Sequence, residues 1–198
     1  MNRPTKTGIR RYKLESAIPN MRFIDIEASD GGPEAWPIEI GWSWLSQNGD
    51  GWDLEQESSL IKPDPEWGPE IWSPYAEAVH GISRASLDDA SAAVAIASRV
   101  WRALGDPSLT VVSDSPKNDQ PWLDRLMSCR GHDRIRIISV WEALNGRAEQ
   151  ENLARMKTWL RENKGPHRAG PDAARLAQSV LECHLAPRLP DQDMRPEL

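Results

Sequence analysis

Two carboxylates stand two positions apart in an apolar segment near the start of the chain. The segment FIDIEAS, residues 23–29, carries Asp25 and Glu27 on either side of an isoleucine. Residues i and i+2 of a strand leave the same face, so these side chains start roughly 6.5–7 Å apart. Two acids this close repel each other unless a cation compensates them, and a hard divalent ion can do so. The alternative interpretation is that both face solvent at the end of the strand.

Three more residues, later in the chain, are of types that fit the same chemistry. Asp119 stands three and four residues before Trp122 and Leu123 at the start of a predicted helix, where it either holds a cation or complements the helix N-terminus. His167 and Asp172 stand in the segment HRAGPD at the opening of the last predicted helix. A neutral imidazole suits general-base work, and a carboxylate in the first turn of a helix suits cation binding. The alternative is that His167 is an ordinary loop histidine.

The segments that must carry these residues change type along the chain. Apolar alternation predicts a strand that ends at Asp25 and Glu27, followed by a β-hairpin whose turn lies at residues 47–51. Three strands in this order would pair antiparallel. Further strands are predicted in SLTVVS and IRIISV, and helices at about 86–104, 120–129, 149–163 and 171–185. This order predicts a mixed α/β sheet, with antiparallel strands and then parallel ones, and helices on both faces.

Composition limits the class of protein. The 198 residues are enough for one domain with a sizeable core, and the net charge of −6 argues against binding to nucleic acid by phosphate neutralisation alone. Cys129 and Cys183 are isolated from each other, so neither a disulfide framework nor a zinc site is indicated. No run of 18 apolar residues exists. We therefore expect a cytoplasmic protein with no membrane partner.

The ends of the chain differ from its centre in composition. Residues 1–20 carry five basic residues and no sustained periodicity, which predicts a basic N-terminal arm, and Met21 is a candidate natural start. Residues 187–198 are rich in proline and charge, which predicts a mobile tail. One domain is expected between them, at 21–186.

Taken in order, these motifs resemble the DEDDh family of 3′–5′ exonucleases, which includes polymerase proofreading subunits and ribonuclease T. FIDIEAS is similar to the family's first motif, VVSDSPKNDQPWL to its second and HRAGPD to its third. Residues 80–83, HGIS, match a segment that in relatives packs near the terminal nucleotide. The resemblance covers about residues 21–185 and implies a ribonuclease H-like fold with a five-stranded mixed sheet.

The resemblance also implies a two-metal mechanism. Asp25, Glu27, Asp119 and Asp172 would hold two Mg²⁺ or Mn²⁺ ions, with Asp25 between them, and His167 would deprotonate the attacking water. Asp114 occupies a position where relatives often have histidine, which makes it an alternative ligand to Asp119.

The resemblance implies substrate contacts as well. Ala28 and Ser29 replace the threonines that commonly follow the first motif near the 3′ end. The tryptophans at 67 and 72 would either stack on unpaired bases or close an edge of the core. The full set of expected substrate-binding residues is Ala28, Ser29, Trp67, Trp72, His80, Gly81 and Ile82.

The function expected is a hydrolase that removes nucleoside 5′-monophosphates from 3′ ends of single-stranded DNA, RNA or short oligonucleotides. A homodimer is possible through a tryptophan-rich surface. One alternative is a non-catalytic nucleic-acid-binding or polymerase-associated module on the same fold. A second alternative is a phosphodiesterase that acts on small molecules.

Overall fold

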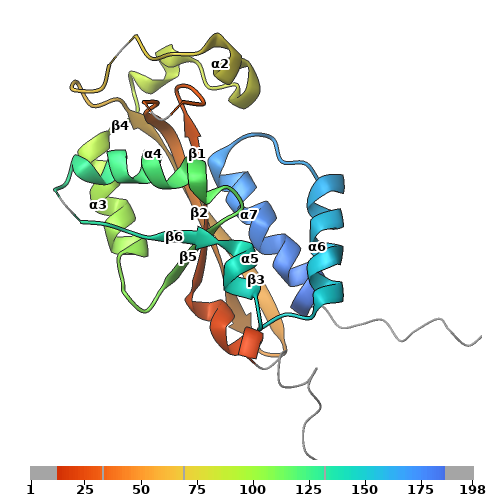
Figure 1. Ribbon diagram of the computed structural model, residues 1–198. Helices are drawn as coiled ribbons and strands as arrows, with labels where there is room; N and C mark the ends of the chain where they lie inside the picture. Colours follow the sequence, from red (N-terminus) through yellow and green to blue (C-terminus); the bar gives the residue numbers. More distant parts are fainter. Residues whose placement is uncertain (1–12, 33, 69, 132, 186–198) are drawn as a thin grey trace, which may run out of the picture.

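The chain folds around a six-stranded sheet with strand order β4-β3-β2-β1-β5-β6 (Figure 1). A computed structural model describes residues 13–32, 34–68, 70–131 and 133–185. The strands are β1 (Met21–Ala28), β2 (Pro37–Asn48), β3 (Gly51–Lys62), β4 (Ser91–Ala92), β5 (Thr110–Ser113) and β6 (Ile137–Ser139). The five predicted strands are all present, and the sixth is the two-residue strand β4.

The pairing of the strands follows the predicted change from antiparallel to parallel. Strands β1 and β2 pair antiparallel, as do β2 and β3, while β5 runs parallel to β1 and β6 parallel to β5. Gly49 forms the turn of the β2–β3 hairpin with a φ of 59°, a left-handed conformation that glycine adopts at no steric cost. The mixed α/β sheet expected from the sequence is confirmed.

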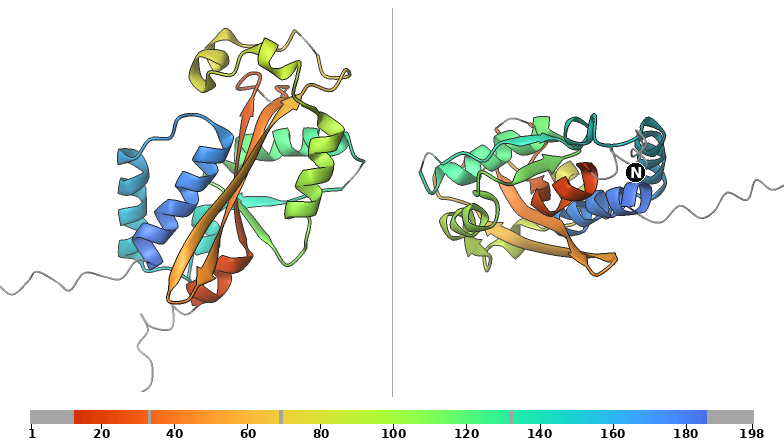
Figure 2. Two further views of the ribbon diagram at one scale, coloured as in Figure 1. Left: turned by 180° about the vertical axis from the view of Figure 1, so that it is seen from behind. Right: turned by 90° about the horizontal axis from the view of Figure 1, so that it is seen from below.

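Helices cover both faces of the sheet (Figure 2). Helices α3 (Ala93–Leu104) and α4 (Pro116–Ser128) pack on one face, in a core that contains Ile24 and Ile26. Helices α5 (Val140–Leu144), α6 (Gln150–Glu162) and α7 (Ala169–Val180) lie over the other face, in a core that contains Phe23. Strand β1 thus has apolar residues on both faces, as expected for a central strand.

Several helix boundaries differ from the prediction, and α4, for example, begins at Pro116 instead of at about residue 120. The helix expected from residue 86 begins at Ala93, because residues Arg84–Leu87 form a 3₁₀ turn and Ser91–Ala92 pairs with β3. Pairing with a strand holds the backbone extended, which excludes a helix there. Helix α7 begins at Ala169, two residues before the predicted start, and ends at Val180, where a wider π-helical turn continues over Leu181–Leu185.

The two ends of the chain are described only in part. Residues 13–17 are helical and Ile18–Asn20 forms a 3₁₀ turn, with Leu14 and Ile18 buried against the core. The rest of the predicted basic arm, residues 1–12, and the predicted tail at 187–198 lie outside the described residues. A short helix, α2 (Pro74–His80), lies beyond the end of β1 (Figure 1). Among the residues described, no helix is both long and apolar enough to cross a membrane.

Candidate functional site

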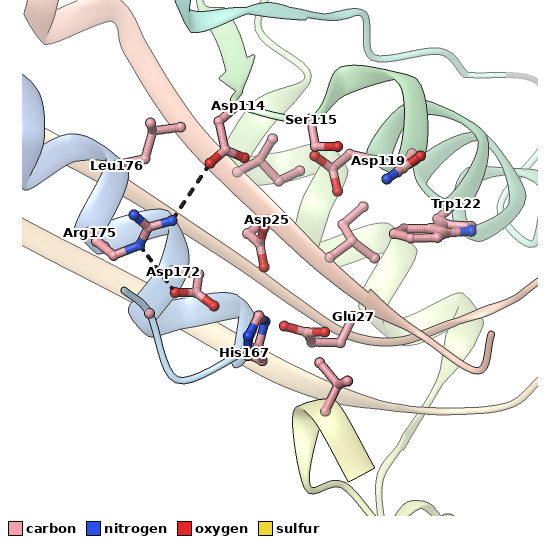
Figure 3. A pocket seen from close by; sticks show the side chains of 15 residues that line it. Asp25, Glu27, Asp114, Ser115, Asp119, Trp122, His167, Asp172, Arg175 and Leu176 are labelled. Carbon is pink, nitrogen blue, oxygen red and sulfur yellow. Dashed lines mark ion pairs between the residues drawn. The ribbon is translucent and has the colours of Figure 1, made fainter. Parts of the chain in front are cut away.

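A pocket of about 460 Å³ opens at the edge of the sheet where β1 and β5 end (Figure 3). Because β1 and β5 run parallel to each other, their carboxyl ends lie side by side, and α/β sheets commonly bind ligands at such strand ends. The lining residues come from segments far apart in the sequence, namely β1, the end of α2, the β5–α4 connection with the first turns of α4, and the loop before α7 with the start of α7. The polar and charged residues that line it are Asp25, Glu27, Asp114, Ser115, Asn118, Asp119, His167, Asp172 and Arg175.

Three carboxylates converge in this pocket. Asp25 and Glu27 come from β1, and Asp172 comes from the first turn of α7. One carboxylate oxygen of each lies within 4.8 Å of one from each of the other two. All three side chains are partly buried. The alternative in which Asp25 and Glu27 simply face solvent is therefore not what the structure shows, because α7 covers the face of β1 from which they project.

The electrostatics of this cluster favour a cation. Burial, and then repulsion from Asp119, Glu27, Asp172 and Asp114, raises the pKa of Asp25 well above its usual range. Burial and the Asp172 charge raise the pKa of Glu27 from 4.5 to about 7. Groups in this state are stabilised as anions when a divalent ion is bound, and carboxylate oxygens are the ligands that Mg²⁺ and Mn²⁺ prefer. The donor set therefore fits a hard divalent metal.

Asp119 lies on the other side of Asp25, in the first turn of α4. Its carboxylate is buried and accepts a hydrogen bond from the Ser113 hydroxyl at the end of β5. Burial raises the pKa of Asp119 from 3.8 to about 7, although the Ser113 hydrogen bond opposes this change. Among the neighbouring charges, Asp119 has the largest effect on Asp25. Asp119 and Asp25 thus form a second pair of neighbouring carboxylates, and no arginine or lysine among the described residues forms an ion pair with either of them.

Asp114 also lines the pocket, but a cation lies beside it. Arg175 places Nη2 3.7 Å from Asp114 Oδ2 and Nε 3.5 Å from Asp172 Oδ1 (Figure 3). Its Nη1 donates to the backbone oxygens of Leu160 and Asn163, which ties α7 to the end of α6. Arg175 is not among the residues predicted from the sequence. Its position three residues after Asp172 on a helix was the available signal.

His167 lies in the loop that leads into α7 and points toward the pocket (Figure 3). Its φ is 55°, and within the described ranges it is the only residue other than glycine with a positive φ. A bulky residue in this conformation is strained, and such strain is frequent at functional sites. Gly165, two residues earlier, lies so close to Asp172 that a Cβ atom there would overlap its carboxylate.

The predicted substrate-binding residues lie outside the pocket lining. Ser29 Oγ accepts a hydrogen bond from the Trp36 backbone, and Nδ1 of the buried His80 accepts one from the Ile82 backbone. Gly81, with a φ of 68°, ends α2, and Ala28 is buried at the end of β1. From helix α2, the neighbouring Val79 is the residue that reaches the pocket. Substrate contact by the predicted residues stays a prediction.

Trp67 and Trp72, which were expected either to stack on bases or to close an edge of the core, both pack against Trp36. The Trp67 side chain is 8% exposed and stacks on Trp36 with ring centroids 6.2 Å apart. Trp72 lies 5.6 Å from Trp36 and donates its Nε1 hydrogen to Glu77 Oε2. Both rings therefore pack at an edge of the core around Trp36, and contact of either ring with bases stays a prediction.

Solved exonuclease structures have a similar fold. The zinc-bound form of the E. coli exonuclease I complex with single-stranded DNA matches with a TM-score of 0.57 and 16% identity, over 82% of this chain and 40% of that one. E. coli exonuclease I with a dT13 oligonucleotide matches with a TM-score of 0.58 and 15% identity, over 83% and 41%. The metal-free form of the E. coli complex matches with a TM-score of 0.55 and 16% identity, over 82% and 39%.

These likenesses concern the fold. No protein-family model matches the chain, and neither does any curated protein sequence. The chain spans about two fifths of the exonuclease I chains that it resembles. The fold expected from the sequence motifs is thus confirmed at the level of the backbone, because solved structures of exonuclease I share it at 15–16% sequence identity.

Proposed function

We propose that this protein is a metal-dependent 3′–5′ exonuclease that acts on single-stranded nucleic acid. One observation carries the proposal: Asp25, Glu27 and Asp172 converge, with raised pKa values for Asp25 and Glu27, in a pocket on an exonuclease fold. A purely structural role gives no reason to gather carboxylates that destabilise the folded chain. A role in binding cations does.

The residues present fit two Mg²⁺ or Mn²⁺ ions. Asp25, Glu27 and Asp172 would hold one ion, and Asp25 and Asp119 would hold the second. When bound, two such ions stabilise both the attacking and the leaving oxygen of a phosphodiester. Asp119 is preferred to Asp114 as the ligand, because Arg175 already compensates the Asp114 charge.

His167 would act as the general base. An imidazole nitrogen of His167 would take the proton from the water that attacks the last phosphodiester of the strand, with release of a nucleoside 5′-monophosphate. The loop holds the imidazole at the rim of the same pocket as Asp172, which is consistent with this role.

The substrate proposed first is the 3′ end of single-stranded DNA. Two of the structures with this fold are described as complexes of exonuclease I with single-stranded DNA or an oligonucleotide. RNA ends, short oligonucleotides and homodimer formation stay predictions. Cleavage of RNA is tested by comparing DNA and RNA of equal sequence, short oligonucleotides by repeating the assay with shorter strands, and the homodimer by sedimentation equilibrium.

The deciding experiment follows the shortening of 5′-labelled single-stranded DNA and RNA of equal sequence, with Mg²⁺, with Mn²⁺ and with a chelator. The wild type is compared with Asp25→Asn and with Asp114→Asn as a control that changes an acid in the same pocket. Stepwise loss from the 3′ end that requires both the metal and Asp25 is expected. A wild type that binds Mn²⁺ and shortens neither strand would favour the small phosphodiester substrate, and one that binds strands without metal would favour the non-catalytic module.

A further inference from the structure

Strand β2 holds the start of α7 at three alternate residues. Glu39, Gly41 and Ser43 lie opposite Glu27, Asp25 and Phe23 of β1, so all six project from the same face of the sheet. Ser43 Oγ donates to the backbone oxygen of Ala173 at 2.7 Å. The backbone of α7 passes so close to Gly41 that a Cβ atom there would overlap the peptide between residues 169 and 170.

Glu39 makes the most directional of these three contacts. The residue is 2% exposed, and its two carboxylate oxygens accept three hydrogen bonds. Arg168 donates from Nε to Oε2 at 2.9 Å and from Nη2 to Oε1 at 2.7 Å. The backbone N–H of Ala169 donates to Oε2 at 3.0 Å. Glu39 therefore binds both a side chain and one of the free N–H groups at the start of a helix.

Arg168, the side-chain partner of Glu39, is linked to two residues proposed for the reaction. Arg168 follows His167 directly, and its backbone N–H donates to Asp172 Oδ2 at 3.2 Å. Asp172 in turn donates its backbone N–H to the Arg168 oxygen at 2.9 Å. Arg168 thus connects the loop that carries His167 to the helical turn that carries Asp172. Glu39 in turn holds Arg168 against the sheet.

The Arg168 guanidinium also compensates the negative charge of Glu39. Glu39 stands directly opposite Glu27, and two acids in this position repel each other. The Arg168 guanidinium makes a bidentate contact with the Glu39 carboxylate, and this contact holds the planar guanidinium in one orientation. The pair is therefore neutral beside a site that is rich in negative charge.

We propose that Glu39 is a positioning residue, which acts through Arg168 and the Ala169 amide to align His167 and Asp172 with Asp25 and Glu27. Glu39 is not among the residues lining the pocket, and no contact with substrate is assigned to it. The inference rests on the proposed function and extends it to a residue that the sequence motifs did not include. Groups that orient metal ligands from behind typically change metal affinity or activity by roughly 10–100-fold when removed.

The test replaces Glu39 by glutamine, which keeps the shape and turns one acceptor oxygen into a donor that faces the guanidinium. The matched control is Glu57→Gln on β3, because Glu57 also pairs with an arginine, Arg99, at 2.6 Å but away from the pocket. Glu39→Gln is expected to lower kcat on single-stranded DNA and to weaken Mn²⁺ binding, each by roughly tenfold or more, with KM for the strand little changed. Glu57→Gln should behave as the wild type.

Three outcomes are decisive. A variant Glu39→Gln that melts at a lower temperature but keeps the kcat and the Mn²⁺ affinity of the wild type would reduce Glu39 to a structural role and overturn the proposal. Equal losses in Glu39→Gln and Glu57→Gln would overturn it too. In a third outcome, the wild type binds Mn²⁺ without cleaving DNA, and Glu39→Gln binds Mn²⁺ more weakly. This result would contradict the nuclease function and support the positioning role of Glu39.

A second variant guards against a failure of Glu39→Gln to fold. Arg168→Lys keeps the positive charge and loses the planar fork that makes the bidentate contact. We expect a loss of kcat and of Mn²⁺ affinity in the same direction as for Glu39→Gln. Wild-type values for both in a folded Arg168→Lys would contradict the proposed alignment.

Discussion

At the scale of single residues, Asp25 holds an unfavourable position for a carboxylate. It lies between Glu27 and Asp172 on one side and Asp119 on the other, and burial, followed by these charges, raises its pKa. The same position makes it the one carboxylate that can belong to both proposed metal ions. Such a residue lowers the stability of the metal-free protein but is required for activity with metal. Its substitution should therefore raise stability and lower activity.

Asp25→Asn should therefore separate stability from activity. With metal, we expect cleavage of single-stranded DNA to fall by more than about 100-fold, beyond the usual effect of a residue behind the ligands. With a chelator near neutral pH, the melting temperature should rise by about 2–4 °C for each kcal/mol of repulsion relieved. Cleavage rates and calorimetric melting measure the two. Unchanged turnover, or a lower melting temperature with chelator, would contradict the assignment of Asp25.

The two acids near the start of α4 should differ in importance. Asp119→Asn should lose most of the activity and much of the affinity for a second Mn²⁺ ion, because no basic side chain in the described part of the chain forms an ion pair with Asp119. Asp114→Asn should retain activity, since Arg175 already pairs with Asp114. Titration of Mn²⁺ binding and cleavage rates distinguish the variants. The reverse ranking would identify Asp114 as the ligand.

At the scale of elements, the close contact between β2 and α7 decides where the third motif lies relative to the first. Glycine at position 41 allows the backbones of β2 and α7 to meet. Gly170 lets α7 approach the Ser58 side chain of β3, whose Cβ lies 2.9 Å from where a Cβ of Gly170 would be. The helix that carries Asp172 is thereby brought down onto the face that carries Asp25.

Gly41→Ala should push the start of α7 away from the sheet. We expect a loss of stability of about 1–3 kcal/mol, the usual cost of overpacking a core, together with a loss of activity larger than unfolding explains. Denaturant unfolding and cleavage below the melting temperature measure these effects. Gly51→Ala on the same hairpin is the control, because its Cβ would meet only the Asn48 oxygen at an ordinary 3.6 Å. Similar behaviour of the two variants would argue against a special role for Gly41.

At the scale of the whole molecule, the acid cluster should invert part of the usual dependence of stability on pH. The pKa of Glu27 rises from 4.5, and that of Asp119 from 3.8, to about 7 in the native protein. At pH values between the unfolded and the native pKa of each group, the native state binds more protons than the unfolded state. Its stability therefore falls as pH rises through this window, and the contribution is constant below and above it. Asp25 acts in the same direction.

This dependence can be measured by calorimetry with a chelator at several values between about pH 4 and about pH 8. The wild type should lose more stability across the window than the double variant Glu27→Gln and Asp119→Asn. Saturating Mg²⁺ should remove the difference near pH 8, because metal binding favours the ionised carboxylates. Equal slopes for the wild type and the double variant in chelator would contradict the raised pKa values.

Much of the local structure was predictable from the sequence. The alternation in FIDIEAS placed Asp25 and Glu27 on one face of a strand, and the turn at Gly49 indicated the hairpin. Such features depend on neighbouring residues, so local periodicity reveals them. The start of α3 was mispredicted because pairing of Ser91–Ala92 with β3, a contact over a long sequence separation, overrides the local helical pattern.

By itself, therefore, the sequence determined which residues are chemically suited to the site, the order of the motifs and the mixed α/β class. Only the tertiary structure decided that Asp172 reaches Asp25 and Glu27, that Arg175 compensates Asp114 rather than Asp119, and that Trp67 packs on Trp36. It also decided the role inferred for Glu39, which lies 129 positions before Arg168. The physical reason is that these contacts depend on how strands pair and how closely a helix can approach a sheet, and no local pattern encodes either.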